Sequence, residues 1–232
     1  MNPYHAKKPT ITIIVAGTND PSNSHLLAEK FKEGAVSQGA DIALIRLKDM
    51  RLDHFDLKCY DSSCTINDRF PEIRDVMQRS DALVFASPVW NFSVPAHFKN
   101  LIDRMGSSGL DEQTRSVGTM NGKPTFLIFT GGSPSVAWPL YRRTLSHVSI
   151  GLQYFGCSVV GTHFEGRCTL GKGKFGLVVD KRPDSLAAIA KKGKSFVQLV
   201  KKFKATGALP LQYRIKRSVV KAGQRVRRKL GW

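Results

Sequence analysis

Five short runs of apolar, mostly β-branched residues recur along the first 165 positions, and a stretch with helical spacing follows each one. The strand-like runs are residues 10–17, 41–47, 82–86, 123–132 and 157–164. Continuous apolar runs of this length are typical of strands that are buried on both faces of a parallel sheet. The alternation therefore predicts an α/β fold, with five parallel strands and helices on both faces of the sheet.

The stretches between and after these runs have the spacing of amphipathic helices. They are residues 24–40, 70–80, 96–106, 139–156 and 185–203. The apolar side is predicted as Leu26, Leu27, Phe31, Ala35 and Val36 in the first helix, and as Leu140, Leu145, Val148 and Leu152 in the fourth. Right-handed crossovers then place the strand-to-helix loops at one edge of the sheet, where open α/β folds bind ligands.

Charge is concentrated at one end of the chain. The net charge is +18, and residues 181–232 hold 16 Lys or Arg but a single acid, Asp184. The first 180 residues hold 20 basic and 17 acidic residues, so their net charge is only +3. We therefore predict a main domain at residues 1–204 and a basic extension at residues 205–232.

Several classes of protein are excluded by simple counts. No apolar run reaches the 18 residues that a transmembrane helix needs. The first 17 residues lack the pattern of a secretory signal, and four cysteines are too few for a disulfide scaffold. These features favour a reducing, cytoplasmic setting.

The first loop at the predicted sheet edge, GTNDPSNS at residues 17–24, is rich in hydrogen-bonding groups. Ser22, Asn23 and Ser24 stand beside the free N–H groups of a helix start, a combination that can receive a phosphate. The same residues could simply cap the helix. The loop matches neither the nucleoside-triphosphate P-loop nor the dinucleotide fingerprint.

The second loop, SPVWNFSVP at residues 87–95, is stiff and apolar. Two prolines restrict it, while Trp90 and Phe92 supply flat surfaces and Asn91 can donate and accept hydrogen bonds. The aromatic side chains could instead pack into the core. Because they fall outside any strand or helix period, we favour a ligand-facing role.

The third loop, TGGSP at residues 130–134, lets the backbone approach a ligand at Gly131 and Gly132. Alone, it would be interpreted as an ordinary glycine turn. Together the three loops predict a site with a phosphate end and a flat aromatic end, which is the shape of flavin mononucleotide (FMN).

The stretch SPVWNFSVPAHFKNLIDR, residues 87–104, resembles the S-P-x-Y-N-x-S-x-P-x-x-L-K-x-x-I-D motif of the NAD(P)H-dependent FMN reductase and quinone reductase family. The resemblance covers roughly residues 10–165. It implies a flavodoxin-like fold with the strand order 2-1-3-4-5. The first and third loops look like that family's phosphate loop and third flavin loop.

The resemblance also implies cofactor-binding roles. The residues that would hold the phosphate are Thr18, Ser22, Asn23 and Ser24. The residues that would border the flavin ring are Pro88, Val89, Trp90, Asn91 and Phe92, with Asn91 bonding the ring edge. The backbone N–H groups that would approach the pyrimidine side are those of Gly131, Gly132 and Ser133.

The first loop departs from the family at one position. It has Asp20 where the family commonly has an arginine, and it is one residue shorter. A carboxylate beside a phosphate is unfavourable unless it points away.

By resemblance, the chain is expected to be an FMN-dependent oxidoreductase. NADPH or NADH would deliver a hydride to the flavin, and a quinone, a flavin or a similar small acceptor would then be reduced. No side chain is identified as catalytic. Relatives imply a homodimer or a homotetramer.

Two other functions fit the same pattern. One is a binding or scaffold module without redox turnover, which Asp20 and the shortened first loop favour. The other is a one-electron carrier, which the basic charge of the chain disfavours.

The sequence indicates no metal site. Cys59 and Cys64 resemble the cysteines of iron–sulfur relatives, but two thiolates are fewer than a cluster needs. These two cysteines could instead form a reversible disulfide or be two inert thiols. His97 could lie near the flavin or on the surface.

The C-terminal segment predicts a basic amphipathic helix. Its apolar stripe is Ile215, Val219, Ala222, Val226 and Leu230. Such a helix binds anionic surfaces, so residues 212–232 predict an anionic membrane or an acidic partner, with Trp232 as an interfacial anchor. A helix docked on its own domain ranks next, and nucleic acid ranks last.

Overall fold

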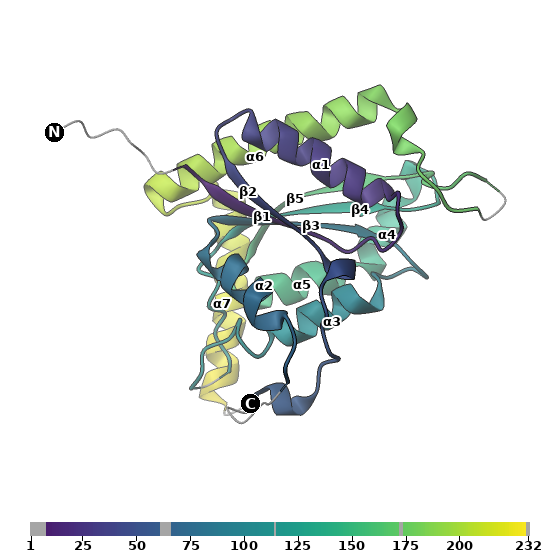
Figure 1. Ribbon diagram of the computed structural model, residues 1–232. Helices are drawn as coiled ribbons and strands as arrows, with labels where there is room; N and C mark the ends of the chain where they lie inside the picture. The colour runs from purple at the N-terminus through teal and green to yellow at the C-terminus, as the bar shows by residue number, and fades with distance from the viewer. Residues whose placement is uncertain (1–7, 61–65, 114, 172–173, 231–232) are drawn as a thin grey trace.

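The sheet agrees with the sequence expectation in strand number, direction and order. The computed structural model describes residues 8–60, 66–113, 115–171 and 174–230. The strands are β1 (Thr10–Val15), β2 (Asp41–Arg46), β3 (Ala82–Pro88), β4 (Pro124–Thr130) and β5 (Ser158–Glu165). They form one parallel sheet in the order β2-β1-β3-β4-β5, the flavodoxin-like arrangement, as Figure 1 shows.

Helices cover both faces of this sheet. They are α1 (Asn23–Val36), α2 (Phe70–Arg79), α3 (Ala96–Met105), α4 (Trp138–Thr144), α5 (Ser146–Tyr154), α6 (Pro183–Thr206) and α7 (Leu211–Lys229). Short 3₁₀ turns occur at η1 (Leu47–Asp49), η2 (Leu57–Tyr60), η3 (Ser135–Ala137) and η4 (Val179–Lys181). Helices α1 and α6 lie on one face and α2, α3 and α5 on the other (Figure 1).

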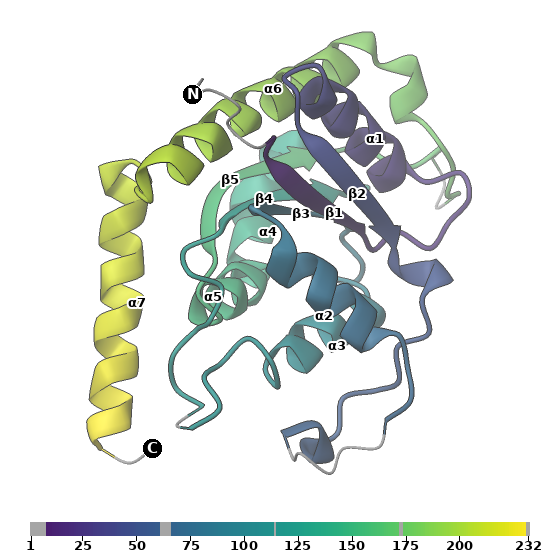
Figure 2. The same cartoon turned by 60° about the vertical axis from the view of Figure 1, so that its left-hand side comes forward.

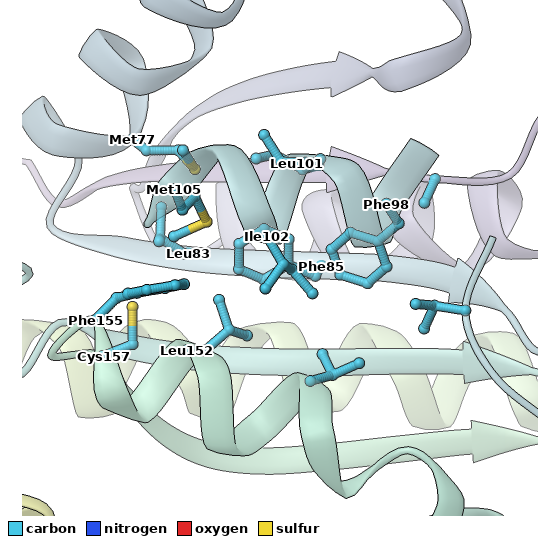
Figure 3. Packing of buried hydrophobic residues seen from close by; sticks show 14 of the residues in the cluster. Met77, Leu83, Phe85, Phe98, Leu101, Ile102, Met105, Leu152, Phe155 and Cys157 are labelled. Carbon is cyan, nitrogen blue, oxygen red and sulfur yellow. The ribbon is translucent and has the colours of Figure 1, made fainter. Parts of the chain in front are cut away.

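The core has two halves because side chains alternate across each strand. In β3, Leu83 and Phe85 contact the α2, α3 and α5 side, whereas Val84 contacts the α1 and α6 side. Figure 3 shows the first half, where the rings of Phe85 and Phe98 stack with their centroids 5.5 Å apart. Burial on both faces is the physical reason why the strands are continuously apolar in the sequence.

Helices α1 and α6 approach each other closely at two glycines. A methyl group on Gly34 would overlap the backbone carbonyl of Ala190, and one on Gly193 would overlap that of Phe31. The two helices therefore pack backbone to backbone, which fixes α1 and the loop that precedes it.

The long irregular segment before α2 is held on α3 by buried polar groups. Arg104 bonds Asp68 at 2.5 Å and the carbonyl of Asp53 at 3.0 Å, and both charged side chains are almost fully buried. Asn100 donates to the same Asp53 carbonyl and accepts from the N–H of Phe55. Cys59 is buried here, whereas Cys64 lies outside the described residues.

Two details of the helices differ from the sequence expectation. The predicted helix at 139–156 is broken at Leu145 into α4 and α5, and Leu140 is 56% exposed instead of buried. The break lets Trp138 stack on Phe164 and Tyr141 pack against the same ring at a tilt, while α5 packs into the core. In α1, Val36 is also half exposed.

The C-terminal region contains two helices joined by a tight turn. Helix α6 ends at Thr206, Gly207 adopts a left-handed backbone with φ of 65°, and α7 begins after Pro210. The predicted boundary at 204/205 thus falls in the last turn of α6, and the division into a domain and an extension stays a prediction. No helix in the described parts of the chain is both long and apolar enough to cross a bilayer.

Candidate functional site

The loops that follow β1, β3 and β4 meet around one cavity at the carboxyl edge of the sheet. The cavity is partly open to solvent, and the space between its lining residues is about 490 Å³ when that open solvent is included. Nine of the predicted site residues line it, namely Thr18, Ser22, Asn23, Ser24, Pro88, Val89, Trp90, Gly131 and Gly132. The other three, Asn91, Phe92 and Ser133, do not line it.

The start of α1 forms a hydroxyl-lined end of the cavity. Ser22 caps the helix by accepting a hydrogen bond from the N–H of His25 at 3.3 Å, so the capping role is real. The hydroxyl oxygens of Ser22 and Ser24 lie 3.1 Å apart, and both residues are buried. A methyl group on Gly17 would overlap both hydroxyls, lying 2.5 Å from that of Ser22. Glycine thus keeps open a small polar cradle beside the helix N-terminus, where anions are stabilised.

The side chain of Asn23 is committed to the fold. Its amide donates to the carbonyl of Gly176 at 2.8 Å and accepts from the N–H groups of Val178 and Val179. The expectation that this side chain helps to hold a phosphate is therefore corrected. What Asn23 offers the cavity is its backbone N–H in the first turn of α1.

Asp20 points away from the cavity and is paired with two cations. Its carboxylate bonds Arg46 at 2.6 Å and Lys48 at 2.8 Å, and it does not line the cavity. The hydrogen bonds from Arg46 and Lys48 lower the pKa of Asp20 to about 2. The departure from the family's arginine thus places no unpaired carboxylate at the phosphate end.

The second loop is a tight turn with a strained backbone. The N–H of Trp90 donates to the carbonyl of Ser93 at 2.8 Å, and the N–H of Ser93 donates to the carbonyl of Trp90 at 2.9 Å. The two residues between them, Asn91 and Phe92, both have positive φ, of 48° and 64°. Asparagine tolerates this conformation, but phenylalanine rarely adopts it.

The aromatic side chains of this turn stay outside the core. Trp90 is 37% exposed and lines the cavity, and Phe92 is 59% exposed. The ring of Phe92 stacks on that of Tyr141, with centroids 6.0 Å apart. The alternative that both aromatics pack into the core is therefore wrong. Asn91 is exposed as well.

The third loop approaches the cavity, but one of its N–H groups is already used. The N–H of Gly131 donates to the carbonyl of Glu165 at 3.0 Å, which extends the pairing of β4 and β5. The expected role of that N–H toward a ligand is corrected, whereas Gly132 lines the cavity. The hydroxyl of Ser133 lies 2.6 Å from that of Tyr141, which draws it away from the cavity.

A fourth wall comes from the segment after β5, which the sequence analysis missed. The residues of this wall are Cys168, Thr169, Phe175 and Gly176. The segment is held in place because the N–H of Cys168 donates to the carbonyl of Gly131 at 2.8 Å. The position of this loop after a parallel strand was the available signal, since all such loops share one edge. Burial raises the pKa of the Cys168 thiol to about 11, so it stays protonated.

His97 supports the floor of the site without lining the cavity. Its Nε2 lies 2.6 Å from the carbonyl oxygen of Ala16, directly after β1. This contact ties α3 to the end of β1. It accounts for the partial burial of His97 by a structural role.

The described residues that line the cavity are all uncharged. They offer hydroxyls, helix N–H groups and a flat wall of Pro88, Val89 and Trp90. Such a set can bind and orient a ligand with one anionic end and one flat end. The titratable group among the described lining residues is the Cys168 thiol, and its raised pKa of about 11 keeps it protonated.

A family model described as NADPH-dependent FMN reductase matches residues 9–163 of the chain. Over 151 residues the chain is 25% identical to an FMN-dependent NADH:quinone oxidoreductase from Bordetella bronchiseptica, covering 56% of this chain and 70% of the relative. The matched region contains the first three loops of the cavity. The fourth wall and α7 lie beyond it.

Solved structures share the fold at low sequence identity. An NAD(P)H:quinone oxidoreductase from Methanothermobacter marburgensis superimposes with a TM-score of 0.63 at 18% identity, covering 81% of this chain and 96% of that one. An FMN-dependent NADH-azoreductase from Bacillus anthracis, solved in complex with FMN, gives 0.61 at 16% identity, covering 82% and 98%. At these identities the likeness shows the fold alone.

Proposed function

Because this chain belongs to the NADPH-dependent FMN reductase family, we propose that it is an FMN-dependent NAD(P)H oxidoreductase that reduces a quinone, a flavin or a similar small electron acceptor. One observation carries the proposal beyond family membership. The loops after β1, β3 and β4 line a single cavity, which has buried hydroxyls at a helix start and a flat apolar wall.

The cradle at Gly17 fits the phosphate of FMN. The hydroxyls of Thr18, Ser22 and Ser24 would donate to the phosphate oxygens, together with the N–H groups of the first turn of α1. These donors are neutral, so the favourable field comes from the helix N-terminus. The nearby group of Asp20, Asp49, Arg46 and Lys48 has no net charge, so it does not oppose the binding of a dianion.

The wall of the second loop fits the flavin ring. Pro88, Val89 and Trp90 would border the ring, and the backbone at Gly132 would approach its pyrimidine side. Asn91, Phe92 and Ser133 would reach a bound molecule only from the rim, since they do not line the cavity.

Bound FMN would supply the redox chemistry, the transfer of two electrons from NADPH or NADH to the acceptor. The chain's own residues orient the reactants and exclude water. The stacked pair of Phe92 and Tyr141 joins the second loop to α4, which stiffens the rim where nicotinamide and acceptor would enter in turn. The protonated Cys168 thiol supplies no nucleophile to this cycle.

The scaffold alternative was favoured by Asp20 and by the shortened first loop, and it loses the first of these two features. The argument from Asp20 was that its carboxylate would lie near the phosphate end. In the structure, Asp20 is instead paired with Arg46 and Lys48 outside the cavity. We therefore favour the enzyme over the scaffold.

The visible spectrum of the purified protein tests the proposal. We expect an oxidised-flavin spectrum, present on purification or after reconstitution with FMN, that bleaches anaerobically with NADPH or NADH. A quinone should restore it. A colourless protein that FMN cannot reconstitute, or a bound flavin that neither nicotinamide bleaches, would contradict the proposal.

We also infer a homodimer or a homotetramer. Apolar side chains are exposed on three segments around the cavity, at Phe92, Val136, Leu140, Leu170 and Phe175. A second subunit would cover some of them. Light scattering on the wild type and on a Leu140→Asp variant tests this inference, since a monomeric wild type would contradict it.

We infer a cytoplasmic setting, because NAD(P)H is supplied there and the described cysteines, Cys59, Cys157 and Cys168, are free thiols. The charge of residues 212–232 supports attachment to an anionic membrane or an acidic partner. This inference does not depend on turnover.

A further inference from the structure

Helix α7 contacts the rest of the protein through one polar side. The inward residues are Tyr213, Arg217, Val220 and Gln224, which are the partly or fully buried positions of the helix. The hydroxyl of Tyr213 donates to the carbonyl of Val160 at 2.7 Å, and the amide of Gln224 donates to the carbonyl of Tyr154 at 2.7 Å. These contacts dock α7 against β5 and the end of α5.

Apart from Val220, the large apolar residues of α7 and its C-cap face the opposite way. Leu211, Ile215, Val219, Val226 and Leu230 are each between 55% and 68% exposed. At 3.6 residues per turn, this stripe is centred roughly 150° around the helix from the docked side. Figure 2 shows α7 along the outer edge of the molecule, with the rest of the described chain on one side of it.

This orientation is the reverse of the usual arrangement. A surface helix of a globular protein turns its apolar stripe to the core and its charges to water. Here hydrogen bonds hold the helix while five large apolar side chains remain in water. The stripe therefore calls for a partner outside the domain.

The charges of α7 narrow the choice of partner. The basic residues are Arg214, Lys216, Arg217, Lys221, Arg225, Arg227, Arg228 and Lys229, and no acidic residue lies between 211 and 229. By helix geometry, Arg214 and Arg225 lie on one side of the stripe and Lys216 on the other, whereas Arg227 lies closer to the docked side and contacts the ring and hydroxyl of Tyr154. The neighbouring charge of Arg217 lowers the pKa of Lys221, which shows how closely the cations gather.

Three kinds of partner satisfy this surface less well than a lipid bilayer does. A second copy of α7 would bring eight more positive charges against the first eight. Nucleic acid would neutralise the charge but leave the stripe in water. An acidic protein would need a straight apolar groove about 28 Å long, bordered by acids on both sides. An anionic bilayer supplies a plane that is apolar below and negative at headgroup level.

We propose that the outward stripe of α7 is a membrane-binding surface, which inserts its apolar side chains at the headgroup boundary of an anionic bilayer while the flanking Lys and Arg residues contact lipid phosphates. At such an interface, long basic side chains bury their methylene groups and keep their charged ends at the level of the headgroups. The surface is separate from the cavity and does not require turnover.

Co-sedimentation of the full chain with vesicles tests this proposal. The vesicles are phosphatidylcholine alone and phosphatidylcholine mixed with phosphatidylserine. We expect binding to the mixed vesicles only, weakening as salt rises. A wild type that does not sediment with mixed vesicles would overturn the proposal.

A variant of the stripe separates insertion from simple charge attraction. We expect Ile215→Gln, Val219→Gln and Val226→Gln together to lower vesicle affinity by about tenfold or more, although every positive charge remains. The matched control carries Val36→Gln, Leu57→Gln and Ile150→Gln, which change three apolar residues exposed elsewhere. It should bind like the wild type. Equal binding by the stripe variant would overturn the proposal.

Two further probes identify the competing partners. Polyglutamate stands in for an acidic protein, and a short DNA duplex for nucleic acid. If either binds the full chain while mixed vesicles do not, the bilayer is overturned as the partner. Circular dichroism and thermal midpoints matching those of the wild type show that both variants are folded, since all six positions are solvent-exposed.

Discussion

The hydroxyl oxygens of Ser22 and Ser24 lie 3.1 Å apart, and both are turned toward the α-carbon of Gly17. Gly17 follows β1 directly, and the two serines begin α1. The polar end of the cavity is thus built from a strand end, a helix start and the space that a missing side chain leaves between them.

Replacing Gly17 by alanine should weaken FMN binding without unfolding the protein. The added methyl group would overlap both hydroxyls and turn them out of the cradle. We expect the FMN dissociation constant to rise by about tenfold or more, equivalent to about 1.4 kcal/mol. Fluorescence titration of the apoprotein measures it. The control is Gly151→Ala, whose methyl group meets Ile102 at an ordinary 3.4 Å, and equal affinities for the two variants would exclude the cradle as the phosphate site.

The buried pair of Arg104 and Asp68 should contribute strongly to stability. Arg104→Met would leave the buried Asp68 carboxylate without its cation, at a cost of about 3–5 kcal/mol in the free energy of unfolding. Urea denaturation of the apoprotein measures it. Arg69→Met removes an exposed pair with Glu72 and should cost at most about 1 kcal/mol. Similar losses in the two variants would disprove the special role of the buried pair.

Glu165 should make the protein sensitive to acid. The His163 ring, whose Nε2 lies 3.3 Å from the carboxylate, and the hydrogen bonds from Arg182 and Ser185 outweigh burial and lower the pKa of Glu165 from 4.5 to about 2. Its contribution is complete above about pH 4.5 and is lost as the pH falls toward 2, since the unfolded chain takes up the proton first.

The Glu165→Gln variant tests this pH dependence. We expect it to lose roughly 2 kcal/mol near pH 6 but much less near pH 2.5, so its stability falls less steeply with acid. Urea midpoints at the two pH values give the difference. Glu72→Gln, at an exposed pair, is the control. Parallel slopes for wild type and Glu165→Gln would contradict the expectation.

The turn at Asn91 and Phe92 should respond to backbone strain. Because Phe92 has φ of 64°, Phe92→Gly removes the strain of a left-handed residue, whereas Phe92→Ala keeps it. Both variants lose the stack on Tyr141. We therefore expect the glycine variant to be more stable than the alanine variant by about 1 kcal/mol in thermal or urea unfolding. The opposite order would show that the turn is not strained.

The sheet was predictable because its strands are buried on both faces. Runs such as 10–17 and 82–86 have no polar alternation to confuse strand with amphipathic helix. Loops that follow parallel strands share one edge, so the meeting of three loops also followed from topology. The strand order did not follow from these runs; it was implied by the resemblance of residues 87–104 to the family motif.

The partners of individual polar groups were not predictable. Whether Asn23 faces a ligand or the segment at 176–179 depends on contacts between residues about 155 positions apart. The N–H of Gly131 is used because β5 continues to Glu165, past its apolar run. The break at Leu145 has no glycine or proline at that position to mark it. It follows from the tertiary packing of Trp138 and Tyr141 on Phe164.

The C-terminal helix was likewise predictable only in part. Its amphipathic spacing is visible in the sequence, but which side meets the domain is decided by Tyr213 and Gln224, two polar residues with distant partners. Trp232 lies outside the described residues.

Tyr213 and Gln224 attach α7 near the beginning of β5 and the end of α5, whereas the cavity lies where β1, β3 and β4 end. The helix and the cavity thus lie at opposite ends of the molecule. If α7 is bound to a membrane, the cavity opens toward the solvent, so small molecules would reach it from solution and not from the bilayer.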